Sequence, residues 1–221
     1  MLRDAAVARI NRGLGFRPVG HSLTDAIISC LIEAQRDLEH GKTLPKFLLI
    51  EDAILVLPAG EHEVALPDRF LRIDEDNLPH YPATNLEVSY PTYLRQMSYS
   101  DAVKWNGARN AGTSLEPNLP GNFVIRRDTI DFIAVAPTDV DFVWNYYKGA
   151  MTLETNVENF WLRYAPEWLI GEAGHRIAMD AGDQNAVAVF ENLRTRGRAA
   201  TFADILLDET AGGPLVMGAN N

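Results

Sequence analysis

Glu172 and His175 are the two residues of this chain whose types and spacing come nearest to metal or acid–base chemistry. They stand three positions apart, so a helix would place them on one face. A Glu-x-x-His pair serves di-iron centres only when it occurs twice, together with two further carboxylates. Here it occurs once, and the five histidines, at 21, 40, 62, 80 and 175, show no metal-ligand spacing. A small metal-dependent hydrolase using Glu172 and His175 therefore stays an alternative hypothesis.

Other chemical motifs are weaker still. The acidic clusters at 74–76 and 51–52 offer hard oxygen ligands, but they lack the regular spacing and turn glycine of a calcium loop, which favours solvated acidic loops. The sequence has no Gly-x-Ser-x-Gly nucleophile motif and no glycine-rich phosphate loop. Cys30 has no His or basic neighbour to lower its pKa, and is most simply a small core residue. We therefore expect no enzymatic activity, no cofactor and no bound metal.

Charge and composition limit the partners further. The net charge is −10, and an acidic chain repels nucleic acid because phosphate affinity depends on Lys and Arg. No apolar run reaches the roughly 18–20 residues that span a bilayer, and the first residues lack the apolar core of a signal peptide. The single cysteine excludes an internal disulfide and a cysteine-based zinc site. These features predict an intracellular protein without a membrane partner.

Two segments are candidates for binding a partner protein. The basic cluster Arg194, Arg196 and Arg198 could hold a phosphate or a partner's carboxylates, although a solvated turn late in the last helix is the plainer interpretation. The second segment is apolar and follows two glycines: Pro214, Leu215, Val216 and Met217. Such a segment is either tolerated disorder or a hook that orders on a partner, and the residues alone leave both open.

The elements that would position these residues begin with two helices. Apolar residues at helical spacing predict a helix over 2–14, and Ser22 with Asp25 opens a second one that stops at Gly41. Near the other end of the chain, Thr155 and Glu158 have the spacing of a capping box. Pro166 then begins a helix to about Ala181, and a last helix runs over 184–208 after a Gly-Asp break.

Between the helices lie short apolar or alternating runs, flanked by Pro and Gly, that are typical of strands. They cover residues 47–50, 53–57, 61–66, 71–73, 123–126, 129–135 and 142–147. The run at 61–66 is expected to pair with 53–57 across the turn at 58–60. Four aromatic residues are expected in the core: Trp144, Tyr146, Phe160 and Trp161.

Helices, then strands, then helices indicate an α+β fold. We expect N- and C-terminal helices to form a helical bundle, with a central antiparallel β-rich insertion and an extended C-terminal tail. One domain would cover 1–208, helical over 1–41 and 151–208 and β-rich over 42–150, and the tail would cover 209–221.

The order of short landmarks along the chain resembles that of head-to-tail adaptor (connector) proteins of podovirus-type bacteriophages. The landmarks after the N-terminal helical pair are Leu66-Pro67-Asp68, Pro120-Gly121, Phe123, Ile130, Phe132, Pro137, Tyr146-Tyr147, Thr155, Trp161-Leu162, Ala165-Pro166, Leu169, Phe190 and Leu193. The chain departs from the pattern in its long central loop, 74–120, and in its extended tail.

This resemblance implies a structural virion protein without an active site, made in the host cytoplasm and located in the neck between head and tail. It implies a homo-oligomeric ring, expected to be a dodecamer, that binds the portal protein on one side and a tail or nozzle protein on the other. DNA would pass through the lumen without specific binding, which suits an acidic chain. The C-terminal segment would extend onto the portal. A generic monomeric interaction module remains a further alternative.

Overall fold

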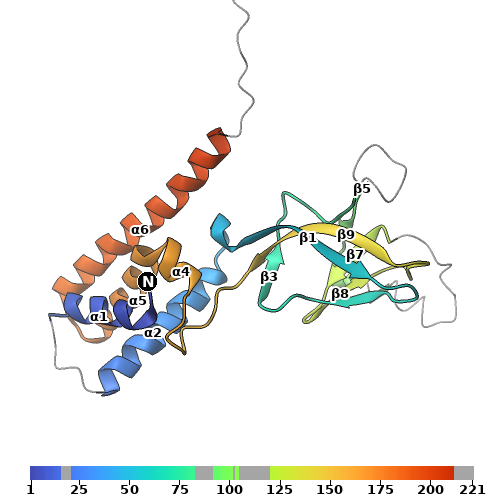
Figure 1. Cartoon of the computed structure of the whole chain (residues 1–221). Helices are drawn as coiled ribbons and strands as arrows, with labels where there is room; N and C mark the ends of the chain where they lie inside the picture. The colour runs from blue at the N-terminus through green and yellow to red at the C-terminus, as the bar shows by residue number, and fades with distance from the viewer. Residues whose placement is uncertain (16–20, 83–91, 102, 105–119, 212–221) are drawn as a thin grey trace, which may run out of the picture. The chain divides into compact units, whose positions relative to one another are not determined.

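The fold is α+β, as expected, and the computed structural model divides into two compact units (Figure 1). One unit combines Met1–Leu48 with Gly149–Asn221, and the other is Leu49–Lys148. The structure describes residues 1–15, 21–82, 92–101, 103–104 and 120–211, without the side chains of 21, 92 and 204–211. The single domain expected over 1–208 stays a prediction, and the two units are described separately below.

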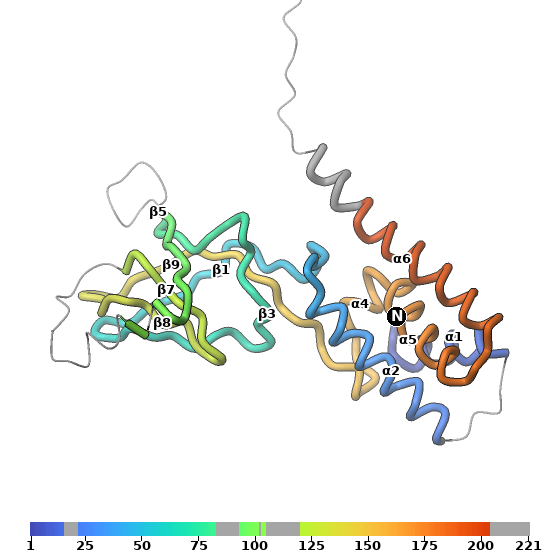
Figure 2. Tube along the Cα trace, turned by 180° about the vertical axis from the view of Figure 1, so that it is seen from behind, coloured from blue at the N-terminus to red at the C-terminus, as the bar shows by residue number. Residues whose placement is uncertain are grey.

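The helical unit is built around one central helix. Its elements are α1 (Arg3–Gly13), α2 (His21–Glu39), the short 3-10 helix η1 (Lys46–Leu48), α4 (Phe160–Tyr164), α5 (Pro166–Asp180) and α6 (Gln184–Ala211). Helix α5 contacts α6, α2, α1 and α4, and lies between α6 and α2 in Figure 2. The core of this unit is buried and mostly aliphatic; it includes Ala6, Ile10, Ile27, Leu31, Ala34, Trp161, Leu169, Ile170, Ala173 and Phe190.

The start of the C-terminal helices differs from the sequence prediction. The capping box at Thr155 and Glu158 is wrong: the first helix there begins at Phe160 and its N-cap is Asn159. Asn159 has extended backbone angles, and its side-chain oxygen accepts hydrogen bonds from the amides of Trp161 (2.8 Å) and Leu162 (3.3 Å). Glu158 cannot open a helix because its backbone forms an antiparallel bridge with Leu2.

Two other predictions at this end of the chain are confirmed and one is wrong. Pro166 is the first residue of α5, as predicted, because its fixed φ suits the first helical position. Trp161 is buried as predicted, but Phe160 is 41% exposed and does not belong to the core. Helix α4 is short and buries Trp161 and Leu162, so Phe160 lies on its outer face.

The strand unit contains two small sheets. Its strands are β1 (Leu49–Leu57), β2 (Glu63–Ala65), β3 (Phe70–Ile73), β4 (His80–Tyr81), β5 (Thr92–Tyr93), β6 (Arg95–Gln96), β7 (Asn122–Ile125), β8 (Thr129–Phe132) and β9 (Val140–Lys148). The first sheet has the order β1-β9-β4-β5, with β3 also paired to β9, and the second has the order β2-β8-β7-β6. All pairs are antiparallel except β6–β7, so the second sheet is mixed and the antiparallel prediction holds only for the first.

Strand β1 corrects two predictions. The runs 47–50 and 53–57 do not form separate strands. Residues 47 and 48 lie in η1, and the rest of both runs belongs to β1, which has an irregularity between Ile50 and Ala53. Asp52 at this point has a φ of 50°, and its amide donates to the side chain of Asn145 (2.8 Å). The predicted hairpin is also wrong, since β1 pairs with β9 while β2 pairs with β8 in the other sheet.

The turn at 58–60 explains this change of sheet. The amide of Gly60 donates to the carbonyl of Ala136 (2.9 Å), and the amide of Ala59 donates to the side chain of Asp139 (2.8 Å). Both bonds bind the turn to the segment between β8 and β9, so the chain leaves β1 toward β8 and does not fold back. The two sheets then share one apolar core, formed by Leu55, Leu57, Ile73, Tyr81, Leu94, Phe123, Ile130, Phe132, Ala136, Val140, Phe142, Trp144 and Tyr146.

Candidate functional site

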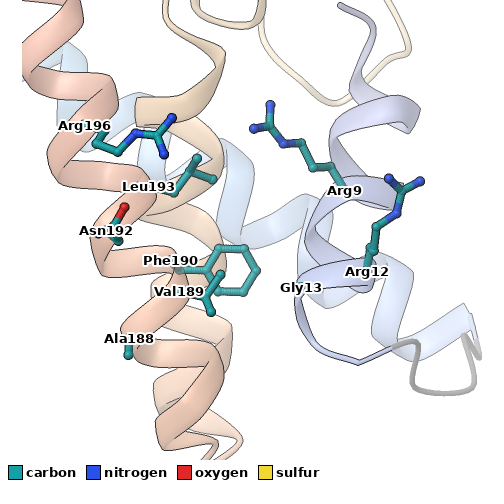
Figure 3. A pocket seen from close by; sticks show the side chains of 9 residues that line it. All are labelled: Arg9, Arg12, Gly13, Ala188, Val189, Phe190, Asn192, Leu193 and Arg196. Atoms are coloured by element: carbon teal, nitrogen blue, oxygen red, sulfur yellow. The ribbon is translucent and has the colours of Figure 1, made fainter.

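The helical unit carries a groove between α1 and α6 (Figure 3). Its volume is about 600 Å³, within the range of protein sites that hold a ligand or an inserted side chain. Helix α1 contributes Arg9, Arg12 and Gly13, and helix α6 contributes Ala188, Val189, Phe190, Asn192, Leu193 and Arg196. These nine residues are called the α1–α6 groove below.

The floor of the α1–α6 groove depends on a glycine. Figure 3 shows the ring of Phe190 pointing from α6 toward Gly13 of α1. A Cβ atom at Gly13 would lie 2.5 Å from Cζ of Phe190, so only glycine leaves room for the ring. Phe190 is buried, while Val189 beside it is 56% exposed. The groove therefore has an anchored apolar floor with one apolar side chain accessible to a partner.

The rim of the α1–α6 groove is positively charged. Three of its nine residues are arginines, none is acidic, and Arg9 and Arg196 extend toward each other from the two helices (Figure 3). Both contact one carboxylate, Glu167, at 3.2 Å from Arg9 and 3.6 Å from Arg196. A single carboxylate balances only one of these two charges. A positive surface thus persists on a chain whose net charge is −10.

The predicted basic cluster is divided between faces of α6. Arg196 belongs to the groove, whereas Arg194 contacts Glu172 (3.4 Å) and Glu191 (2.6 Å). Partial burial lowers the pKa of Arg194, but hydrogen bonds and the charges of these two carboxylates raise it overall. Arg198 is exposed and borders a second hollow of about 650 Å³, which also includes Trp168, Glu172, Arg194 and Phe202.

The expected solvated turn at this cluster is wrong in one respect. Because α6 continues to Ala211, the arginines lie near the middle of the helix, where its terminal dipole does not reach them. The partners of Arg194 and Arg196 are acids on α5 and α6. The other predicted partner-binding residues, Pro214, Leu215, Val216 and Met217, lie outside the described residues.

The candidate metal and acid–base residues are engaged in packing α5 against α6. Glu172 accepts a hydrogen bond from Arg194, and Nε2 of His175 lies 3.4 Å from a carboxylate oxygen of Glu191. The part of the chain that the structure describes contains no group of three His, Cys, Asp or Glu side chains placed to hold a metal ion. These residues therefore have a structural explanation as links between two helices.

Cys30 and the acidic clusters also have structural surroundings. Burial raises the pKa of Cys30, and the charges of Glu33 and Asp180 raise it further against the opposing effect of Arg176, which disfavours the nucleophilic thiolate. Asp74 is buried and accepts from the amide of Asp76 (3.4 Å) and the side chain of Asn77 (2.9 Å), so the prediction of a solvated acid is wrong there. Cys30 itself is half-buried, so the prediction that it is a small core residue is wrong.

Arg9 and Arg12 were missed by the sequence reasoning. They lie three positions apart on α1, a spacing that puts both on one helix face, and Arg12 directly precedes Gly13. This spacing can be seen in the sequence, but it indicates a binding site only once α6 is known to place Phe190 and Arg196 opposite. Pairing of α1 with α6 joins residues more than 170 positions apart, and no local pattern predicts it.

Comparison with known proteins finds no match among protein-family models and none among curated proteins. Within the described ranges, no helix combines the length and the apolar character needed to cross a membrane.

Proposed function

We propose that this protein is a head-to-tail adaptor of a bacteriophage virion, which forms a ring in the neck, binds the portal and joins it to the tail. The observation that supports this proposal best is the α1–α6 groove. An apolar floor supplies area for a partner side chain, and an arginine rim supplies orientation through charged hydrogen bonds. A surface of this kind serves protein assembly, which is what an adaptor does.

In this proposal the N- and C-terminal helices form the bundle that carries the ring, and the strand unit is its insertion. Helix α6 leads directly into residues 212–221, which would extend as a tail onto the portal and dock through Leu215, Val216 and Met217. The acidic strand unit, with 15 acidic and 8 basic residues over 49–148, fits a passage that DNA traverses without sticking.

Negative-stain electron microscopy of this protein mixed with the portal oligomer from the same genome tests the proposal. A new collar at the narrow end of the portal, with a stoichiometry near that of a dodecamer, is the expected result. A portal that stays unchanged beside free protein would overturn portal docking.

A matched pair of variants tests whether the tail binds the portal while the fold is unchanged. Deletion of 212–221 should abolish the collar, while the circular dichroism spectrum and Tm stay those of the full chain because α6 is left intact. Replacement of Leu215, Val216 and Met217 by serine keeps the length of the tail and should have the same effect. A collar that forms normally with both variants would show that the tail does not bind the portal.

A further inference from the structure

A row of side chains crosses the outer face of the first sheet. Val143 of β9 pairs with Ile54 of β1 on one side and with His80 of β4 on the other, and His80 pairs with Tyr93 of β5. Residues directly opposite each other on neighbouring strands project from the same face. The row therefore runs across four strands. Ile54 is 69% exposed and Tyr93 is 57% exposed.

The row ends on a strand that terminates its sheet. Among the described strands β1 pairs with β9 alone. Val56, two residues from Ile54 and on the same face, is 47% exposed, and residues 53–57 carry no charge. An uncharged stretch of a terminal strand with exposed apolar side chains is a surface on which a partner can dock. Ile54, Val56, Val143, His80 and Tyr93 are called the β1 face.

Carboxylates border the β1 face. Asp141 pairs with Val56 across the sheet, and Glu51 and Asp52 precede the uncharged run at the other end of β1; all three are exposed. This arrangement is the electrostatic complement of the α1–α6 groove, in which arginines border an apolar floor. Complementary charge around a matched apolar centre is the pattern that selects one partner and fixes its register.

We infer that the β1 face of one copy of this chain docks on the α1–α6 groove of a second copy. Ile54 and Val56 cover Val189 and Leu193, and the bordering carboxylates face Arg9, Arg12 and Arg196. The two surfaces differ and lie on different units of the chain, so the contact is head-to-tail and repeats from copy to copy, closing into a ring when its rotation permits. This inference rests on the proposed ring, for which it supplies the contact between subunits.

The apolar tail of the same chain is a poorer occupant of this groove. Leu193 lies about 27 Å from Ala211 along α6, at a rise of about 1.5 Å per residue. Met217 follows Ala211 by six residues, which span at most about 22 Å when fully extended. The apolar tail residues therefore cannot reach Leu193 of their own helix, or the groove residues that precede it on α6, and they remain available for the portal.

Site-specific cross-linking tests the contact. In full-length protein with Cys30→Ala, Ile54→Cys is introduced into one preparation and Val189→Cys into another, both at exposed positions. A short bismaleimide should link the mixture into a covalent dimer, while neither preparation alone is linked. A chain that carries both cysteines should give a ladder of higher oligomers. Each reaction is run with and without the portal oligomer, because the ring can require its portal to assemble.

Three results would overturn the inference. A dimer from Ile54→Cys alone would mean that β1 edges pair with each other. Cross-links from Val189→Cys to Val216→Cys, in place of Ile54→Cys, would mean that the tail of another copy fills the groove. Absence of any cross-link, both alone and on the portal, would mean that the two surfaces do not meet.

Charge reversal gives a second test that does not require exact placement of thiols. Arg9→Glu with Arg196→Glu should lower the yield of the cross-linked dimer about tenfold, since like charges would then face each other. Adding Asp141→Lys to the partner preparation should restore most of the yield, whereas Arg127→Glu, at an exposed site in the strand unit, should leave it unchanged. No loss on reversal, or loss without rescue, would contradict the assigned charge pairing.

These outcomes are separable from those for the proposed function. A collar on the portal without cross-linking would support the adaptor function and refute this contact between subunits. A cross-linked ladder that never forms a collar would support the contact between subunits and refute portal docking.

Discussion

The two units of this protein differ in what limits their packing, and the helical unit depends on glycines at close contacts between its helices. Helices α5 and α6 approach so closely that a Cβ atom at Gly171 would collide with the backbone of Arg194, and one at Gly197 with the backbone of Trp168. A Cβ at Gly174 would collide with the ring of Phe190. Each glycine permits contact that any other residue would prevent, so this unit should tolerate added atoms poorly.

The strand unit depends on volume that is filled. Aromatic rings pack in series within its core: Trp144 and Tyr146 lie 4.7 Å apart, and Phe132 and Phe142 lie 4.9 Å apart, centroid to centroid. Phe70 stacks on Trp144 at 5.8 Å. Such rings bury large apolar areas and gain from their mutual orientation. This unit should therefore tolerate the removal of atoms poorly, so the two units of one chain are sensitive to different kinds of substitution.

The largest expected effect is the removal of volume from the strand unit. Trp144→Ala should destabilise it by about 3–5 kcal/mol, because a buried ring would leave a cavity among neighbours that collapse only in part. Urea unfolding followed by far-UV circular dichroism measures the loss. Ile54→Ala on the exposed side of β1 is the control and should change stability by less than about 0.5 kcal/mol. Equal effects of both variants would refute the filled-core description.

Added volume in the helical unit should have the next largest effect. Gly197→Ala should cost about 1–3 kcal/mol, although alanine favours helices, because its Cβ meets backbone atoms of α5 that no rotamer change can move. Gly121→Ala is the control, since nothing lies within 4 Å of a Cβ there. Differential scanning calorimetry should show a lower Tm only for the first variant. A stabilised Gly197→Ala protein would mean that α5 and α6 are not in close contact.

A polar cluster in the helical unit permits a finer test of what fixes its geometry. The amide nitrogen of the Asn159 side chain donates to Gln35 (3.0 Å) and to the carbonyl of Met151, while its oxygen caps α4. Glu39 accepts from the indole of Trp161 (3.0 Å) and from the amide of Ala150 (3.0 Å). These buried and partly buried bonds fix the position at which the chain returns to the helices after the strand unit.

Asn159→Ala should therefore destabilise the helical unit by about 1–2 kcal/mol, the usual cost of losing an N-cap. Thr155→Ala is the matched control, because the sequence pattern assigns the cap to Thr155 and the structure does not. Its expected effect is below about 0.5 kcal/mol. If thermal unfolding ranks the two variants in the reverse order, α4 begins earlier than Asn159 and the capping-box prediction is restored.

The contrast between these two residues shows what a sequence can and cannot predict here. The helices were predictable because their apolar stripes are local, and Ile27, Leu31 and Ala34 of one such stripe are all buried. The N-cap of α4 was not predictable, because Thr155 and Asn159 are both good N-cap residues. The bridge between Leu2 and Glu158, which are distant in sequence, decides that the helix begins after Asn159.

The sequence did not predict the strand pairing or the groove, and the physical reason is the same for both. The pairing of β1 with β9 joins residues about 90 positions apart, and a short turn at 58–60 locally favours the hairpin that does not form. Likewise, Arg9 and Arg196 border the same groove only because α1 packs near α6. Short periodic patterns thus identified elements and much of the core, such as Trp144 and Tyr146, while the groove depends on which distant elements pack together.

The smallest expected effect is a dependence of stability on alkaline pH that belongs to the strand unit. Burial raises the pKa of Tyr81, whose hydroxyl donates to the carbonyl of Pro120 (2.5 Å), so the folded state keeps a proton that the unfolded state loses above the ordinary tyrosine pKa of about 10. The stabilisation is complete well below pH 10 and declines as pH rises through the pKa of the unfolded chain. Ionisation of the unfolded chain should cost about 0.4 kcal/mol at pH 10 and more above it.

Tyr81→Phe separates the titration from the lost hydrogen bond. The missing bond should lower stability by about 0.5–1.5 kcal/mol at every pH, whereas the missing phenol should flatten the decline between pH 9 and 11. The decline should not vanish, because burial also raises the pKa of Tyr146 and Tyr147. Urea midpoints at pH 8, 9.5 and 10.5 measure the slope. An unchanged slope in Tyr81→Phe would show that the phenol of Tyr81 ionises equally in the folded and unfolded chain, and therefore that this end of the filled core is open to water.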